Sequence, residues 1–181
     1  MRYFSIVLLF IFSIFFCGCG FDNNEKFFNN LKSKNMMVVN EAAYELGENK
    51  EEKAVPFLID LIKGDQPKVI KITAIEALGK IGSDSSVNAL VDMLGKKNDN
   101  QVRIAACNAL GKIKSPDAME PLLGVAGTVG EDRDARLFSL WALGSIGDER
   151  AVPLLTSLLD DPDKYISYNA RQALKTIGNG K

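Results

Sequence analysis

Residues 134–155 read DARLFSLWALGSIGDERAVPLL, and this stretch decides the fold because versions of it recur along the chain. Its centre, Ala142-Leu143-Gly144-Ser145-Ile146-Gly147, reappears as Ala77-Leu78-Gly79-Lys80-Ile81-Gly82. With the first glycine as the reference position, the counterparts are Gly47, Gly79, Gly111, Gly144 and Lys175, spaced by 32, 32, 33 and 31 residues. Self-similarity at one nearly fixed period predicts a repeat protein.

Positions far from the glycine repeat as well. Eleven residues after the reference position come Leu58, Leu90, Leu122 and Leu155, and five residues before it come Ala42, Ala74, Ala106, Ser139 and Ala170. Apolar residues on both sides have helical spacing, which predicts a first helix ending near the glycine and, after a short turn, a second helix of roughly a dozen residues. Such helix pairs cannot bury their apolar faces alone, so stacked pairs must form the core.

Two further patterns accompany the repeat. Gly82, Gly147 and Gly178 each lie three residues after the reference position, and we predict that they are left-handed C-caps of the first helices. Lys71, Arg103 and Arg136 each lie eight residues before it, close to acidic turns. We interpret these cations as members of exposed ion pairs between repeats, which contribute only about 0 to 1 kcal/mol each.

The repeat resembles a known family. Ala-Leu-Gly-x-Ile-Gly after the first helix, followed by Ala151-Val152-Pro153-Leu154-Leu155 in the second, resembles the short HEAT-like repeat of the phycobilisome-lyase type over about residues 36–178. The resemblance implies an all-α fold: an α-α superhelix of about four and a half to five helix-pair repeats over residues 36–181. Residues 24–35 are expected to form an N-terminal capping helix. Such arrays are typically protein-binding scaffolds, but a fold alone does not fix an activity.

Composition argues against an enzyme. The chain of 181 residues has no histidine, which removes the imidazole base, the usual catalytic triads and histidine metal ligands. Relatives similar to deoxyhypusine hydroxylase hold iron with His-Glu motifs, which this chain lacks, so we expect no metal and no cofactor. With 22 basic and 23 acidic residues, the net charge of −1 gives no drive toward nucleic acid. Cys107 falls on an apolar column and is predicted to be a buried structural thiol.

The N-terminus has the layout of a signal peptide. Residues 3–16 (YFSIVLLFIFSIFF) form an apolar run preceded by Arg2, so residues 1–18 are predicted to be a signal peptide of the lipoprotein type. Phe16-Cys17-Gly18-Cys19 resembles a bacterial lipobox, which implies lipidation of Cys19 and a short tether over residues 19–23. The expected location is the cell envelope, with a lipid anchor in a membrane. An ordinary secretory signal or an uncleaved anchor is the alternative.

Candidate contact residues are those that break the polar pattern of the helix surfaces. Phe138 and Trp141 are three residues apart in a first helix, at columns that hold polar or small residues in most other repeats. Alternatively, the irregular connection 124–130 folds over them. In the second helices, Phe57, Asp60, Asp92 and Leu154 suggest a surface that is acidic toward the N-terminus and apolar toward the C-terminus, or simply a solvated groove.

These observations predict a non-enzymatic, membrane-anchored scaffold of the bacterial cell envelope that binds another envelope protein. An architectural repeat module that associates with itself is one alternative. A lyase or isomerase related to the bilin-lyase HEAT proteins is the other, although bilin lyases act on a cytosolic pigment antenna and this chain carries an export signal.

Overall fold

The structure is a computed structural model that describes residues 23–179. The predicted signal peptide (1–18), the lipidation site Cys19 and nearly all of the tether (19–23) therefore lie outside the described residues. Among the described helices, none is both long enough and apolar enough to span a membrane.

Residues 23–179 fold into helices joined by turns and contain no strand. The first helices of the repeats, which we call the A helices, are α3 (Met36–Glu48), α5 (Lys68–Ile81), α7 (Asn100–Ile113), α9 (Arg133–Ile146) and α11 (Lys164–Asn179). The second helices, the B helices, are α4 (Val55–Lys63), α6 (Val87–Met93), α8 (Met119–Gly127) and α10 (Val152–Ser157). One further helix, α2 (Asn23–Asn30), precedes the first pair.

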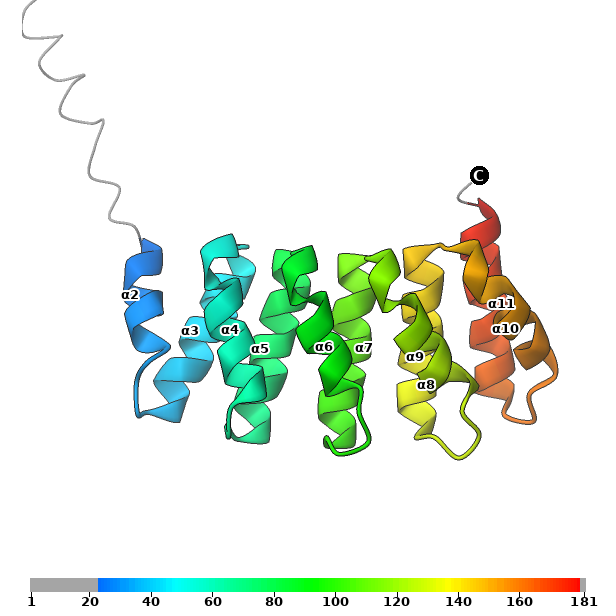
Figure 1. Cartoon of the computed structure of the whole chain (residues 1–181), viewed down its shortest axis with the longest axis horizontal. Coiled ribbons are helices and arrows are strands. Elements are labelled where there is room, and N and C mark those ends of the chain that lie inside the picture. Colours follow the sequence, from blue (N-terminus) through cyan, green and yellow to red (C-terminus); the bar gives the residue numbers. More distant parts are fainter. Residues whose placement is uncertain (1–22, 180–181) are drawn as a thin grey trace, which may run out of the picture.

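The helices stack in the order of the sequence, from α2 at one end to α11 at the other (Figure 1). Consecutive A helices pack against each other, and each B helix packs against the A helix that follows it. The predicted fold class is confirmed: the chain is an all-α solenoid of four helix pairs and a final A helix.

The core is the layer that the repeat pattern predicts. The leucines that directly precede the reference glycines and those eleven residues after them are fully buried: Leu46, Leu78, Leu110 and Leu143 in the A helices, and Leu58, Leu90, Leu122 and Leu155 in the B helices. All members of the small-residue column are also fully buried. In Ser139 the hydroxyl donates a hydrogen bond to the Leu122 carbonyl at 2.6 Å, so its polar atom is satisfied.

The closest approach between A helices occurs at the reference glycines. A Cβ atom on Gly79 would lie 2.8 Å from the Cα of Ala109, and one on Gly144 would lie 2.9 Å from the Cα of Ala173. Gly47 and Gly111 meet the next A helix in the same way. These glycines, rather than the small-residue column alone, therefore set the distance between neighbouring repeats.

Left-handed residues end four of the A helices, as the C-cap in α5, α7 and α9 and directly after the C-cap Asn49 in α3. Gly82 and Gly147 have φ values of 79° and 78°, so these two predictions are confirmed. The same position is held by Lys50 and Lys114, whose φ values are also positive, 49° and 62°. The prediction for Gly178 is wrong, because α11 continues through this residue to Asn179 and makes no turn there.

Two predicted lengths differ from the structure. The B helices have six to nine residues, and each begins after a three-residue 3-10 turn: η1 (Glu52–Ala54), η2 (Asp84–Ser86), η3 (Pro116–Ala118) and η4 (Glu149–Ala151). A fifth turn, η5 (Leu158–Asp160), follows α10. The capping helix expected over residues 24–35 ends at Asn30, because Asn35 already caps the next helix by accepting a hydrogen bond from the Met37 amide.

Candidate functional site

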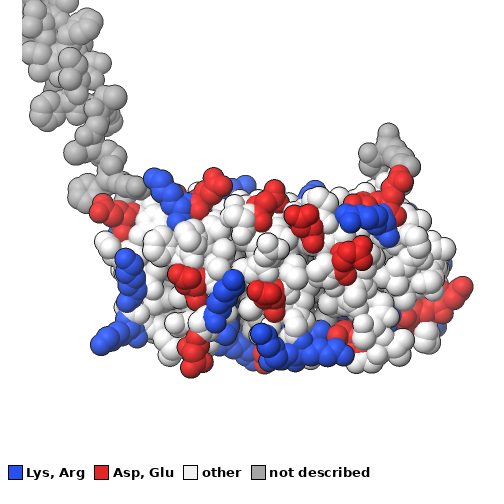
Figure 2. Space-filling model, viewed as in Figure 1, with Lys and Arg blue, Asp and Glu red and all other residues white. Residues whose placement is uncertain are grey.

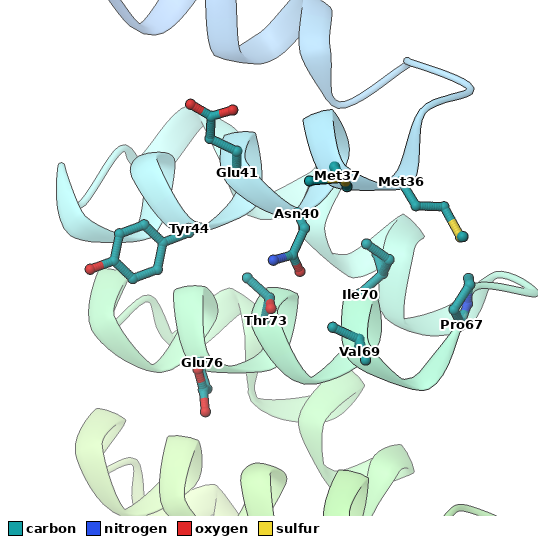
Figure 3. A pocket seen from close by; sticks show the side chains of 10 residues that line it. All are labelled: Met36, Met37, Asn40, Glu41, Tyr44, Pro67, Val69, Ile70, Thr73 and Glu76. Atoms are coloured by element: carbon teal, nitrogen blue, oxygen red, sulfur yellow. The ribbon is translucent and has the colours of Figure 1, made fainter.

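Two surface hollows lie on the A face, which we define as the surface that the A helices form away from the B helices, and two others lie beside the B helices α8 and α10. One hollow lies between α3 and α5 and is called the α3–α5 hollow (Figure 3). The other is centred on α9 and is called the α9 hollow. Residues of the A helices line both hollows, and Pro67, which precedes α5, also lines the first. The candidate surface therefore lies opposite the B helices, where four of the predicted contact residues lie.

The α3–α5 hollow has a volume of about 670 Å³ and a mainly apolar lining. Its residues are Met36, Met37, Asn40, Glu41, Tyr44, Pro67, Val69, Ile70, Thr73 and Glu76. Met37 and Val69 are 81% and 61% exposed, which is unusual for large apolar side chains. Sequence analysis missed this hollow, although Met37 and Val69 hold the same column, ten residues before the reference position, where other repeats have Gln101 and Asp134.

The α9 hollow has a volume of about 280 Å³ and is lined by Asn108, Leu137, Phe138, Trp141 and Asn169. The predicted contact residues Phe138 and Trp141 therefore share one site, and they are 40% and 43% exposed. The alternative, in which the connection 124–130 covers them, does not hold. A Cβ on Gly111 would lie 2.5 Å from a ring atom of Trp141, so the indole rests against the reference glycine of the preceding repeat.

The four candidates on the B helices do not form one site. They lie on α4, α6 and α10, and only Asp60 and Asp92 are exposed without a described packing role. Phe57 packs against Phe28 of α2, with ring centroids 5.6 Å apart, and so helps to hold the terminal helix. Leu154 is half-buried beside Gly127. Figure 2 shows charges of both signs scattered over this face rather than a surface of a single sign.

The cations eight residues before the reference position are not the exposed ladder that we expected. Arg103 Nη1 lies 2.8 Å from Glu131 Oε1, and both side chains are about 95% buried. Arg136 Nη2 lies 2.8 Å from Asp161 Oδ2, and these side chains are also largely buried. Lys71 has no ion pair within residues 23–179. The arginines can be buried because, besides the ion pairs, their Nε–H groups are satisfied by the Leu94 and Ala126 carbonyls, at 2.9 and 3.0 Å.

The buried ion pair also changes the acid–base properties of its carboxylate. The hydrogen bond from Arg103 holds the pKa of Glu131 below its ordinary value of 4.5, despite the opposing effect of burial. Each arginine joins an A helix to the connection that ends its own repeat, through Glu131 before α9 and Asp161 before α11. These pairs are structural ties and not part of either hollow.

Cys107 is fully buried, as predicted, and burial raises the pKa of its thiol to about 12. The thiol is thus protonated at neutral pH and unreactive. Within the part of the chain that the structure describes, no three acidic or cysteine side chains gather where a metal ion could bind. The expectation that the protein needs no metal stays a prediction.

Comparison with known proteins agrees with this architecture. A family model of HEAT repeats matches residues 24–106, 57–130 and 96–175. The chain belongs to the HEAT repeat family. The HEAT matches cover the described A and B helices from α2 to most of α11, so the resemblance read from the sequence is confirmed at the level of the repeat.

Solved HEAT and armadillo structures share the fold. A chain in the complex of CpcE and CpcF of phycocyanin lyase, from a Nostoc species, is 26% identical with a TM-score of 0.74; the match covers 87% of this chain and 65% of that one. This chain thus spans less than two thirds of that neighbour. A designed armadillo repeat protein in complex with the peptide (KR)4 is 17% identical with a TM-score of 0.63, covering 83% and 80%. No curated protein matches the sequence.

Proposed function

We propose that this HEAT repeat protein is a non-enzymatic scaffold of the bacterial cell envelope, held on a membrane by a lipid on Cys19, and that it binds another envelope protein. The observation that carries the binding role is the α9 hollow, where Phe138 and Trp141 stay exposed on one helical face. Aromatic side chains at the centre of a surface hollow are the residues that most often dominate binding energy.

The geometry of Trp141 suits this role. Its ring rests on Gly111, where no side chain intervenes, so the indole is held in place while 43% of it faces solvent. A contact residue that is already ordered loses little conformational entropy when a partner binds. The side chains of Asn108 and Asn169 flank the aromatic pair; the Asn169 amide nitrogen donates to the Tyr165 carbonyl at 2.8 Å, which leaves its oxygen and the Asn108 amide as polar groups at the rim.

The likeness to the Nostoc structure supports a protein-binding role, because that neighbour comes from a complex of two proteins. The same likeness, together with the resemblance of the repeat sequence, supports the lyase-related alternative. The lyase activity belongs to that protein as a whole, of which this chain spans 65%. We therefore favour the scaffold and propose that the solenoid itself performs no catalysis.

Site-specific cross-linking tests the scaffold. A photoreactive amino acid placed at Asn108, beside the aromatic pair, should capture one partner protein in the envelope, while the same probe at Asp92 on the B side should not. The double substitution F138S/W141S should abolish capture, and Val129→Ser, at a 94% exposed loop residue, should leave it unchanged. Cross-links only between copies of the chain would favour the architectural module, and equal capture from Asp92 would contradict the assignment of the surface.

The lipid anchor is tested separately. Labelling with palmitate should be lost in Cys19→Ser and retained in Cys17→Ser, the neighbouring cysteine of the same segment. Label that persists in Cys19→Ser would contradict the anchor and leave the binding role of the solenoid intact.

A further inference from the structure

We propose that the α3–α5 hollow is a second binding site, and that it takes a segment of a partner protein carrying apolar side chains together with lysine or arginine. The inference rests on the proposed scaffold role but concerns a different pair of helices from those that hold Phe138 and Trp141. Its test uses synthetic peptides, so it reports on this hollow alone.

The α3–α5 hollow brings four exposed large apolar side chains together. Met36, Met37, Val69 and Tyr44 are 56%, 81%, 61% and 48% exposed. Exposed apolar residues that adjoin one another mark binding surfaces, whereas isolated ones do not. Methionine side chains are flexible and polarizable, so this lining can adapt to an incoming side chain.

The equivalent positions in the other repeats show whether the solenoid requires these apolar residues. If these apolar residues served the solenoid, they would recur in every repeat, as the leucine layer does. Instead, the column of Met37 and Val69 continues with Gln101 and Asp134 before Tyr165, and the column of Tyr44 continues with Glu76 and Asn108 before Trp141. Only at the first junction do two neighbouring repeats both hold an apolar residue ten positions before the reference glycine, so this apolar pair is not required by the architecture.

Charge identifies the chemistry of the occupant. Glu41 and Glu76 are the charged residues of the lining, which contains no lysine or arginine. Within residues 23–179 neither glutamate forms an ion pair. The nearby Lys80 is paired with Glu48, and its Nζ lies 4.5 Å from the ring centroid of Tyr44. Lys80 also interacts electrostatically with Glu76, but one lysine offsets only part of the negative charge that Glu41, Glu48 and Glu76 bring to this end of the hollow. The rim therefore favours a basic partner.

The two kinds of lining residue are separated along the hollow. Figure 3 shows Glu41, Tyr44 and Glu76 at one end, and Met36, Pro67, Val69 and Ile70 at the other. Glu41 extends from α3 away from α5, and Glu76 extends from α5 away from α3, so the two carboxylates lie at opposite outer edges of the hollow (Figure 3). An occupant would thus place its apolar side chains toward Val69 and its cation toward the glutamates.

Asn40 supplies a third observation, independent of the other two. It lies between the two ends of the hollow (Figure 3), and its Oδ1 is buried without a hydrogen-bond donor among the described residues. A buried acceptor without a donor is costly, and such groups in native structures call for an explanation. If the Asn40 side chain, which lines the hollow, turned toward a bound segment, an N–H group of that segment, from its backbone or from a lysine or arginine, would satisfy this oxygen.

The methionines provide a direct readout. Met36 and Met37 lie in the hollow, whereas Met93 and Met119 are buried in the core, so methyl-labelled methionine gives probes and internal controls in one spectrum. The full chain in a zwitterionic detergent is titrated with octapeptides of alternating leucine and lysine, leucine and glutamate, or serine and lysine. We expect the leucine-lysine peptide to shift the signals of Met36 and Met37 only. The other two peptides should bind at least about tenfold more weakly, because each lacks one of the two required features.

Matched variants test the location and the charge. Val69→Asp should weaken binding of the leucine-lysine peptide at least about tenfold even though it adds a negative charge, and Val129→Asp, which adds the same charge at an exposed loop, should not. E41Q/E76Q should weaken it several-fold and reduce its dependence on salt. Asn40→Leu should raise the melting temperature while weakening binding, a combination that a purely structural asparagine would not give.

The proposal would be overturned if all peptides shifted Met36 and Met37 alike, if Val69→Asp behaved like Val129→Asp, or if Met93 and Met119 shifted to the same extent as the surface pair. Such a failure, with capture at Asn108 intact, would leave the scaffold in place and remove only this site. Loss of capture at Asn108 with normal peptide binding would contradict the proposed scaffold role of the α9 hollow and leave the α3–α5 site in place.

Discussion

The two ends of this solenoid are built from the same leucine layer but are tied together differently. Near the N-terminus, the position eight residues before the reference glycine holds Val39 and then Lys71, and neither takes part in an ion pair within the described chain. In the third and fourth repeats it holds Arg103 and Arg136, each bound to a carboxylate from the connection that ends its repeat.

This difference shows that repeats with the same apolar core can be stabilised by different polar contacts. In the C-terminal half, a buried charge pair fixes each of these connections to the A helix of its own repeat, so polar as well as apolar contacts hold the chain where it passes to the next repeat. The N-terminal half depends on apolar packing and surface pairs such as Lys68 with Asp99, whose side chains are 45% and 48% exposed. We expect the N-terminal half to open first, because local stability follows the contacts that must be broken.

The largest effects should come from charges placed in the leucine layer. Leu143→Asp buries an unpaired charge and should cost at least about 4 kcal/mol, enough to melt the whole array because the N-terminal half relies on its neighbour. Leu78→Asp should instead leave the helices of the C-terminal half folded. Circular dichroism at rising temperature measures this, and equal residual helicity in the two variants would contradict the comparison.

Breaking one buried tie should have the next largest effect. Glu131→Gln leaves the guanidinium of Arg103 buried without its counter-charge and should cost about 3 kcal/mol in the free energy of unfolding. Asp99→Asn, which removes the charge of an exposed pair but keeps an N-cap side chain, should cost about 0 to 1 kcal/mol. Urea denaturation of both variants tests the distinction, which fails if their costs are similar.

The same tie predicts how stability changes in acid. The pKa of Glu131 is lowered in the folded state, so its contribution is fully present above the ordinary value of 4.5 and is lost as the pH falls through the lower, folded value. The free energy of unfolding, measured across this pH range, should therefore depend less steeply on pH in Glu131→Gln than in the unaltered chain. Identical slopes would show that the pair does not control acid stability.

A smaller effect is expected at the glycines that the two halves share. Gly79→Ala and Gly144→Ala each place a methyl group within 3 Å of a backbone atom of the next A helix, and each should cost about 2 kcal/mol. Gly124→Ala in α8, where a methyl group meets open space, should be neutral or slightly stabilising. A large difference between Gly79→Ala and Gly144→Ala in thermal melting would mean that the halves differ in helix spacing as well as in their ties.

The smallest effect concerns the caps. Lys114 takes a left-handed conformation with φ of 62°, where the equivalent residues Gly82 and Gly147 have no side chain to strain. Lys114→Gly should therefore stabilise the protein by about 1 kcal/mol. Lys50→Gly should act in the same way in the N-terminal half, and destabilisation in either case would contradict the strain argument. Differential scanning calorimetry resolves changes of this size.

Much of the fold was predictable because the repeat reports the same packing several times. Leu143 and Ser139 could be placed in the core from the sequence, since every copy repeats their columns. Properties that occur once or twice were harder to predict. The burial of Arg103 depends on the path of the connection that carries Glu131, and no periodic pattern encodes that path.

The candidate site was predicted only in part for the same reason. Phe138 and Trp141 stand out as aromatic residues in columns that, apart from Tyr44, hold polar or small residues, and the structure places them in one hollow. Phe57 looked like a similar exception, but its ring packs against Phe28, a contact across the sequence that column comparison does not detect. Predicting the α3–α5 hollow requires the distance between two helices, and comparison of residues within one column does not give that distance.

The position of Trp141 makes its fluorescence a report of mechanical strain in the solenoid. It is the sole tryptophan of the chain, and its ring lies on Gly111 of the preceding A helix, at the junction between α7 and α9. Any stretching or twisting that separates these helices lifts the indole from the glycine and exposes more of it to water. Its emission wavelength therefore reports mechanical extension at the middle of the array without an added label.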